Sequence, residues 1–304
     1  MKQRGKILVI RGGAIGDFIL TVPAIAALRR QFPETHIEIL GYPHIAKLAL
    51  EANLVDEVKS IEAGALAGFF ARNGTLSVEL MKYFSQFNII ISYLYDPDLI
   101  FQNNVLTCTK ANFIVGPHRP DESKKIHATK LFLRPLETLA IYGVDEVPRL
   151  NLASDATHPP RRIALHPGSG SDKKNWPEAN WAQLIELILS STDVNLLIVG
   201  GEAEGERLQR LAAALPPSRV TVAQSLPLPD LGRLLQGCIG FVGHDSGISH
   251  LAAAVGLPTL ILWGNSVEEI WRPQGEHVII AKSVRGLNAL TVEEVVEELN
   301  KLLE

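Results

Sequence analysis

Two polar turns in this sequence carry side chains that could hold a phosphorylated substrate. The first lies in FVGHDSGISHLAAAVGLPTLILWG, residues 241–264, between an apolar run and a helical spacing of apolar residues. It contains Asp245, Ser246 and Gly247, and His250 follows one helical turn later. A helix that begins there directs free backbone N–H groups and the positive end of its dipole at the turn, which suits a phosphate. The alternative is an ordinary strand-to-helix turn that Asp245 or Ser246 caps.

The second polar turn is HPGSGSDKKNWPE, residues 166–178, which also follows an apolar run. Ser169 offers a hydroxyl group, Gly170 keeps the backbone open, and Lys173 and Lys174 offer positive charge. No GKS or GKT follows, so the turn is not a Walker loop. It indicates either a phosphate-binding loop of another kind or a solvated basic loop.

Two acidic side chains could also take part in a binding site or in catalysis. Glu202, in GGEAEGER, follows a further apolar run and could accept hydrogen bonds from ribose hydroxyls, whereas Glu204 and Glu206 are expected on a solvated helix face. Asp17 ends the loop RGGAIGD, residues 11–17. It either caps the helix that begins there or takes a proton from a hydroxyl nucleophile as a general base.

Other readings of the polar segments fit less well. RGGAIGD departs from the dinucleotide fingerprint, because Arg11 replaces the first glycine and Gly41 stands where an acid should end the second strand. Binding of NAD or a flavin is therefore not expected. The DxD pattern of Asp96, Pro97 and Asp98 is typical of metal-dependent sugar transferases, but Pro97 favours a turn, and we expect no metal site there.

A basic stretch, GPHRPDESKKIHATK, is the remaining candidate. It contains Arg119, Lys124, Lys125 and His127. It is either an exposed loop or the place where an anionic acceptor docks.

Composition limits the function classes. The chain has 304 residues, 46% hydrophobic and 20% charged, with a net charge of −4, which predicts a large core and no general nucleic-acid surface. Cys108 and Cys238 match neither a zinc spacing nor a disulfide framework, so a reduced, cytoplasmic protein is expected. No run reaches about eighteen apolar residues, the length of a membrane span.

The pattern of apolar runs predicts the elements that position these side chains. Two series of alternating strands and helices are joined by a linker at 144–160, which is rich in Pro, Asp and Thr. Such alternation indicates two doubly wound α/β domains, 1–155 and 156–304, with ligands at the carboxyl ends of the strands. Strands are predicted at 6–10, 36–40, 55–61, 88–93, 111–115, 162–166, 194–200, 219–223, 241–243, 259–262 and 277–281. Helices are predicted at 16–31, 64–72, 75–86, 99–107, 177–190, 203–215, 229–236 and 291–303, with others after 43 and before 143.

Three segments together resemble glycosyltransferase family 9, the heptosyltransferase family of lipopolysaccharide assembly. They are ILVIRGGAIGDFILTVPAIAALRRQFP near the start, HPGSGSDKKNWPEANWAQL, and HDSGISHLAAAVGLPTLILWG. The resemblance covers nearly the whole chain. It implies a GT-B fold, in which two Rossmann-like domains face an interdomain cleft and the second holds the nucleotide sugar. It further implies inverting transfer that requires no metal, and the last helix can pack back on the first domain.

Residue roles follow from the resemblance by position. Asp17 resembles the catalytic base, Lys174 the lysine on the donor phosphates, with Lys173 as the alternative register, and Glu202 the ribose ligand. The diphosphate and sugar contacts resemble the segment that contains Asp245, Ser246, Gly247 and His250. The donor site is expected to include Ser169 and Gly170 as well. SYLYDPDLIFQNN departs from the D-x-Q-G-like segment of the family, so the acceptor contacts do not carry over.

The expected function is transfer of a heptose from ADP-heptose to a hydroxyl group of a lipopolysaccharide core or a related glycan. The expected partners are these two substrates, with no nucleic acid and no cofactor. The expected location is the cytoplasm or the cytoplasmic face of the inner membrane, with peripheral attachment at most. The alternatives are another nucleotide sugar, a non-catalytic nucleotide- or carbohydrate-binding relative, and a GT-B epimerase that needs no acceptor.

Overall fold

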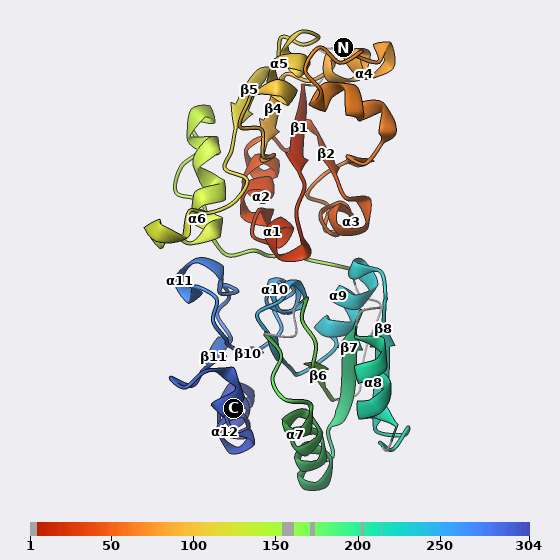
Figure 1. The fold of residues 1–304 in the computed structure, drawn as a ribbon, viewed down its shortest axis with the longest axis vertical. Helices are drawn as coiled ribbons and strands as arrows, with labels where there is room; N and C mark the ends of the chain where they lie inside the picture. Colours follow the sequence, from red (N-terminus) through yellow and green to blue (C-terminus); the bar gives the residue numbers. More distant parts are fainter. Residues whose placement is uncertain (1–4, 154–160, 171–173, 202–203, 214) are drawn as a thin grey trace. The chain divides into compact units, whose positions relative to one another are not determined.

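The chain folds into two compact units, Met1–Glu146 and Val147–Glu304, in a computed structural model (Figure 1). The structure describes residues 5–153, 161–170, 174–201, 204–213 and 215–304. The division falls before the expected boundary at 155, because the segment after Glu146 packs on the second unit. There the N–H of Leu150 donates to the carbonyl of Ala254 at 2.8 Å.

The first unit is built on a parallel sheet of five strands in the order β3-β2-β1-β4-β5. The order reverses between β1 and β4, the kind of point at which doubly wound sheets bind ligands. The strands are β1 Lys6–Arg11, β2 His36–Gly41, β3 Glu57–Ser60, β4 Ile89–Ser92 and β5 Asn112–Val115. The helices are α1 Ile15–Ile19, α2 Val22–Gln31, α3 Pro43–Glu51, η1 Gly64–Phe70, α4 Val78–Phe84, α5 Ile100–Leu106, η2 Glu122–Lys124, α6 Ala128–Leu133 and η3 Arg134–Leu139.

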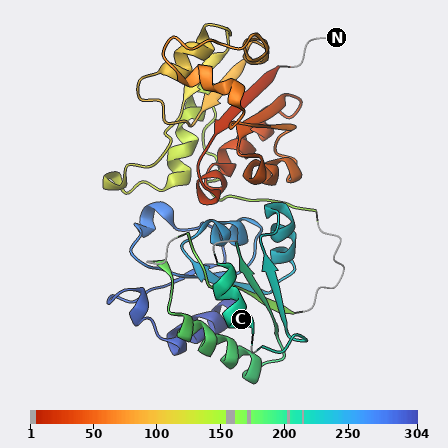
Figure 2. The same cartoon turned by 45° about the vertical axis from the view of Figure 1, so that its right-hand side comes forward.

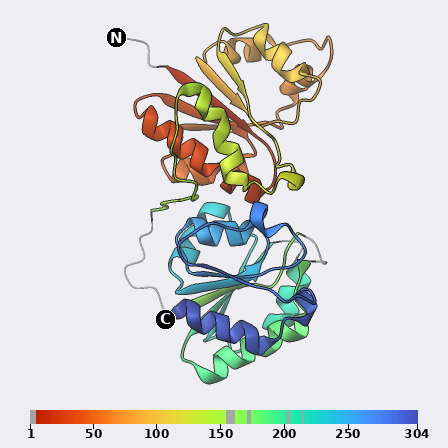
Figure 3. The same cartoon turned by 90° about the vertical axis from the view of Figure 1, so that its left-hand side faces the viewer.

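Helices cover both faces of this first sheet (Figure 3). Leu8 and Ile10 of β1 belong to a core cluster with residues of η1, α4 and α5. Ile7 and Val9 are equally buried, and they point to the opposite face because side chains alternate along a strand. Burial on both faces explains why β1 reads as a continuous apolar run.

The second unit repeats the architecture with a parallel sheet of six strands in the order β11-β10-β9-β6-β7-β8. Its order reverses between β6 and β9. The strands are β6 Arg162–His166, β7 Asn195–Gly200, β8 Val220–Gln224, β9 Gly240–His244, β10 Thr259–Leu262 and β11 Val278–Ala281. The helices are α7 Glu178–Ser191, α8 Gly205–Ala212, α9 Leu228–Gln236, α10 Gly247–Ala254, α11 Glu268–Trp271, η5 Leu287–Ala289 and α12 Val292–Leu303.

The last helix, α12, packs on the second sheet next to α7 (Figure 2). Val295 and Leu299 of α12 share a core cluster with Trp181 and Ile188 of α7. A capping box starts α12, in which the backbone N–H of Glu294 donates to the Thr291 hydroxyl and the Glu294 carboxylate accepts from the Thr291 N–H.

One predicted helix is wrong in its extent. The helix expected over 16–31 is two helices, α1 and α2, with a break at Leu20 and Thr21. The cause is Pro23, which has no N–H to donate to the preceding turn and stands in the first turn of α2.

Within the part of the chain that the structure describes, no helix combines the length and the apolar character needed to cross a membrane.

Replacing Leu196 by Ala should destabilise the second unit. Leu196 is fully buried in β7, and removal of a core leucine side chain costs about 2–5 kcal/mol because a cavity remains. Urea unfolding followed by tryptophan fluorescence measures the loss, since all four tryptophans lie in this unit. The matched change Val284→Ala removes a fully exposed side chain and should cost less than about 0.5 kcal/mol. Equal losses in the two variants would contradict the described core.

Candidate functional site

Asp17 lies in α1, at the carboxyl end of β1. Its Oδ2 accepts a hydrogen bond from the N–H of Ala14 at 3.0 Å, so the side chain does cap the helix. Gly13 is in the left-handed region at φ 99°, and a Cβ there would lie 3.0 Å from the same oxygen. The Asp17 side chain nevertheless remains 30% exposed. The two roles expected for this residue are therefore compatible, because the cap holds one oxygen and leaves the carboxylate open to solvent.

Arg11, the last residue of β1, holds the turn that contains Asp17 by a hydrogen bond to the backbone. It is buried, and its Nη2 donates to the Asp17 carbonyl at 3.1 Å and lies 3.9 Å from Oδ1 of the same residue. Its Nη1 donates to the carbonyl of His118 at 2.9 Å. The guanidinium lies over the ring of Phe132 at 4.5 Å. Burial lowers the pKa of Arg11, and the Asp17 carboxylate opposes that shift.

Arg11 is a residue that sequence reasoning missed. In the sequence it stood out only as the misfit in a glycine fingerprint. A signal was present, because a lone arginine that ends an apolar strand must be buried with a partner or lie at the sheet edge. The structure shows that it joins the turn of Asp17 to the loop after β5.

The basic stretch after β5 is less basic in the structure than its sequence indicates. Arg119 pairs with Glu122 at 3.1 Å, and Lys124 pairs with Asp121 at 3.4 Å, all four on the surface. Acids of the same loop thus offset two of its expected docking cations. His127 caps α6 by accepting the N–H of Thr129 on Nδ1 at 3.3 Å.

Lys125, Tyr95 and Asp96 lie in the loops at the same edge of the first sheet. Lys125 is in the left-handed region at φ 49°, which turns the chain toward α6. Tyr95, which follows β4, is 71% exposed, and its ring centroid lies 4.6 Å from that of His118. Asp96 accepts the N–H groups of Phe101 and Gln102 at 3.2 and 2.9 Å. It therefore caps α5, and the turn predicted at this DxD-like segment is confirmed.

In the second unit, Lys174 and Asp245 meet at the carboxyl edge of the sheet, although they are far apart in sequence. Their Nζ and Oδ2 atoms lie 2.6 Å apart, and the Ser266 hydroxyl donates to the same oxygen at 2.5 Å. The Lys174 side chain is 43% exposed, whereas that of Asp245 is 10% exposed. The carboxylate thus holds an accessible ammonium group beside the start of α10.

Ser246 is the N-cap residue of α10, as one reading of the turn predicts. Its hydroxyl accepts the N–H of Ser249 at 3.4 Å and lies 3.3 Å from Nδ1 of His166. Gly247 begins the helix, and His250 is buried one turn later. The first N–H groups of a helix have no partner inside it, and the ion pair with Asp245 brings Lys174 to the turn that precedes them.

A buried histidine, His244, connects the two polar turns. The N–H of Trp176 donates to its Nε2 at 2.8 Å, and its Nδ1 lies 3.1 Å from the carbonyl of Gly168. A carbonyl only accepts, so Nδ1 carries the proton and Nε2 is free to accept. Burial lowers the pKa of His244 to about 4 and that of neighbouring His166 to about 3. The network therefore holds neutral imidazoles.

Ser169 and Gly170 continue the loop that this histidine holds. Ser169 is buried, and Gly170 is exposed with open space where a Cβ would stand.

The expectation that Glu204 is a solvated helix residue is wrong. Its carboxylate accepts the N–H of Gly201 at 2.8 Å, and a Cβ on Gly168 would meet its side chain at 2.2 Å. Glu206, at the other extreme, is almost fully exposed.

Two expected residues, Glu202 and Lys173, lie outside the described residues. Within each unit the structure brings most other candidates together. Asp17 shares an edge of the first sheet with the loop after β5, through Arg11. Lys174, Asp245 and Ser246 share an edge of the second sheet with Ser169, through His244. The edge of the first sheet carries a carboxylate that can accept a proton. The edge of the second sheet carries an ammonium group that can bind an anion.

Known proteins are similar to this chain in sequence and in fold. The family described as glycosyltransferase family 9 (heptosyltransferase) matches residues 137–299. Lipopolysaccharide heptosyltransferase 1 of Pseudomonas aeruginosa is 35% identical over 149 residues, which is 49% of this chain. The match spans only 40% of that relative's length.

Two solved structures are similar over nearly their whole length. The glycosyl transferase family 9 structure from Veillonella parvula has a TM-score of 0.80 at 18% identity, and the match covers 100% of this chain and 98% of that one. The Escherichia coli heptosyltransferase WaaC with ADP-2-deoxy-2-fluoro heptose has a TM-score of 0.74 at 19% identity, covering 97% and 99%. At these identities the likeness shows a shared fold.

The buried histidine network should make the second unit sensitive to acid. His244 and His166 titrate near 6.5 when unfolded and near 4 and 3 when folded, so the unfolded state binds more protons below pH 6.5. Stability is therefore full above pH 6.5 and falls as the pH drops toward 4. Urea unfolding at several pH values measures this slope.

The slope should be smaller in His244→Gln, which lacks the titrating ring. His277→Gln, a change of an exposed histidine in the same unit, should keep the slope of the unmodified protein. If His244→Gln kept the full slope as well, the buried neutral His244 would not be its source.

Proposed function

Since the chain belongs to glycosyltransferase family 9, the heptosyltransferase family, we propose that it transfers a heptose from ADP-heptose to a hydroxyl group of a lipopolysaccharide core or a related glycan. The bound ADP-2-deoxy-2-fluoro heptose of the similar Escherichia coli structure supports the choice of donor. The observation that carries the proposal is the ion pair of Lys174 with Asp245 at the start of α10. The pair holds an accessible ammonium group beside a helix start at the carboxyl edge of a doubly wound sheet, where the helix dipole favours an anion.

On the donor side, we assign the diphosphate to the second unit. The Lys174 ammonium is accessible, Asp245 holds it beside the start of α10, and the Ser266 hydroxyl donates to the same Asp245 oxygen. The ammonium group and the helix start both stabilise negative charge, and the charge on ADP grows as the glycosidic bond breaks. Ser246, Gly247, His250, Ser169 and Gly170 complete the proposed donor site. Glu202 is proposed as the ribose ligand on the strength of the family resemblance.

On the acceptor side, we assign the general base to Asp17. Its carboxylate takes the proton of the acceptor hydroxyl while that oxygen attacks the anomeric carbon and ADP leaves from the opposite face, so the configuration inverts. Two hydrogen bonds support this role. The Ala14 N–H orients the Asp17 carboxylate, and the Arg11 guanidinium fixes the Asp17 backbone through its carbonyl. The reaction requires that Asp17 reach the sugar that the second unit binds, and domain motion can provide this.

The acceptor itself is proposed to contact the loop after β5. Arg119, Lys124, Lys125 and His127 lie on this loop, and Arg11 fastens its start to the Asp17 turn. The exposed ring of Tyr95 beside His118 offers an apolar face to a sugar ring. We place the reaction in the cytoplasm or at the cytoplasmic face of the inner membrane, where the two unpaired thiols would stay reduced.

Asp17→Asn should lower kcat about 10²–10⁴-fold, the usual contribution of a general base, while the Kd of the donor changes little. An asparagine oxygen can still accept the N–H of Ala14, so the cap is kept. Turnover is measured as release of ADP with a heptose-free lipopolysaccharide acceptor, and donor affinity by calorimetry.

The control for Asp17→Asn is Asp96→Asn, because Asp96 also caps a helix of the first unit. This control should keep nearly full turnover. Undiminished turnover in Asp17→Asn, or an equal loss in both variants, would refute the role of Asp17 as the base.

Lys174→Gln should weaken ADP binding about 10- to 100-fold, since a hydrogen bond to a charged group contributes about 1.5–3 kcal/mol. Lys301→Gln is the matched control, because Lys301 also pairs with carboxylates but lies on α12. Calorimetric titration with ADP measures both. Unchanged ADP affinity in Lys174→Gln would count against the donor site.

Turnover of the unmodified protein should also survive treatment with EDTA, because the proposed transfer requires no metal. A loss of turnover that added metal restores would contradict transfer without a metal.

A further inference from the structure

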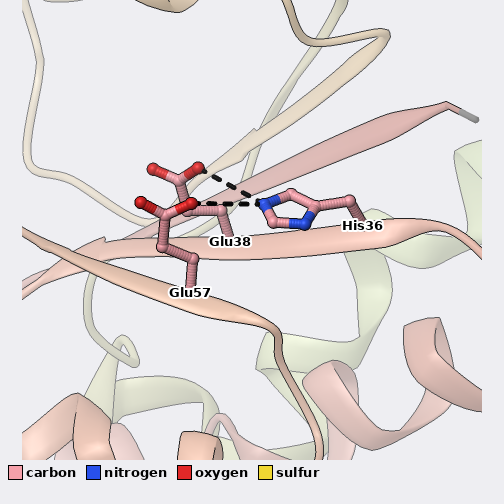
Figure 4. Close-up of side chains that lie close together, drawn as sticks. All are labelled: His36, Glu38 and Glu57. Carbon is pink, nitrogen blue, oxygen red and sulfur yellow. Dashed lines mark ion pairs between the residues drawn. The ribbon is translucent and has the colours of Figure 1, made fainter.

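Three potential metal ligands lie together on β2 and β3, outside the proposed site (Figure 4). His36 and Glu38 are two residues apart on β2, so their side chains leave the same face of the strand. Glu57 begins β3 and is the register partner of Glu38 across the parallel pair. The strand pairing therefore brings an imidazole and two carboxylates to one place, with ligand atoms within 4.8 Å of one another.

The three groups face one another at distances that suit a shared cation. Nε2 of His36 lies 3.7 Å from Oε2 of Glu38 and 3.6 Å from Oε2 of Glu57. Both distances are too long for a hydrogen bond, and Nε2 is buried without a hydrogen-bond partner. Two ligands at the usual zinc distances in a tetrahedral site lie about 3.4 Å apart.

The remaining carboxylate oxygens have other partners. Lys59 lies 3.5 Å from Oε1 of Glu38 and 3.5 Å from Oε1 of Glu57. The hydroxyl of Tyr83 donates to the same Oε1 of Glu38. Each glutamate thus turns one oxygen toward these partners and the other toward His36. Partners of this kind orient the ligands of known metal sites.

The burial of Glu38 is a further sign of a bound cation. Its side chain is 1% exposed and lies beside the carboxylate of Glu57. A buried carboxylate next to a second one is costly unless positive charge offsets both. Lys59 offers one positive charge for two carboxylates, and its side chain is 44% exposed.

We propose that His36, Glu38 and Glu57 bind one divalent transition-metal ion of the Zn²⁺ class, which ties β3 to β2. Mixed imidazole and carboxylate ligands fit zinc and its neighbours, and water can fill the open positions because His36 and Glu57 reach the surface. β3 is the edge strand of its sheet, so such an ion would fasten an element that pairs on one side only. The ligands lie on β2 and β3, whereas Asp17 follows the carboxyl end of β1, so the site is independent of the proposed transfer.

The test is calorimetric titration of the full chain, free of any histidine tag, with ZnCl₂ after treatment with EDTA. We expect one zinc ion per chain and a rise in the melting temperature of the first unit, because a ligand that binds only the folded state stabilises it. Co²⁺ in place of Zn²⁺ should give the visible absorption of a nitrogen- and oxygen-ligated ion.

His36→Gln and Glu57→Gln should each weaken zinc binding at least about 10-fold and abolish the rise in melting temperature, as loss of one ligand predicts. The controls His44→Gln and Glu62→Gln change an exposed histidine and an exposed glutamate of the same unit and should bind zinc normally. Absence of binding at millimolar zinc would overturn the proposal. So would equal binding in His36→Gln, which would leave His36 as a simple ion-pair partner of the two glutamates.

Discussion

The central constraint on this structure is that its inner strands are buried on both faces. β1 and β9 have apolar side chains or glycine at nearly every position, and helices cover them on each side. In these two strands the polar side chains are therefore confined to the strand ends. Arg11 ends β1 and His244 ends β9, and each is the buried polar residue that holds the loops at that edge of its sheet.

These two buried polar residues perform the same task with different chemistry. Arg11 donates two hydrogen bonds to carbonyl groups and so joins two loops of the first unit. His244, at the end of β9, accepts from the Trp176 N–H and donates to the Gly168 carbonyl, and so holds the loop that follows β6 against the turn that follows β9. A buried polar group is costly unless it is paired, so each one accepts few arrangements of the loops around it. This constraint holds Asp17 and Lys174 in place without burying them.

The resemblance of three segments to a family, and the apolar runs between them, predicted the doubly wound sheets and most elements to within a few residues. The start of α10 was predictable because Ser246 and the apolar spacing after it identify a helix start. The extent of the first helix was not, because the effect of Pro23 on the preceding turn depends on how α1 and α2 pack. Glu204 was misread because its neighbour Gly168 lies on another loop, and the two meet only when the loops after β6 and β7 approach each other.

The sequence by itself determined which residues stand at strand ends, since alternation and apolar runs are local properties of the chain. Only the tertiary structure decided which of them meet. Lys174 and Asp245 come into contact because β6 and β9 are neighbours, although two strands separate them in sequence. His36 and Glu57 face each other for the same reason, through the register of β2 and β3. Strand order is a long-range property, because the free energy of the whole core fixes it.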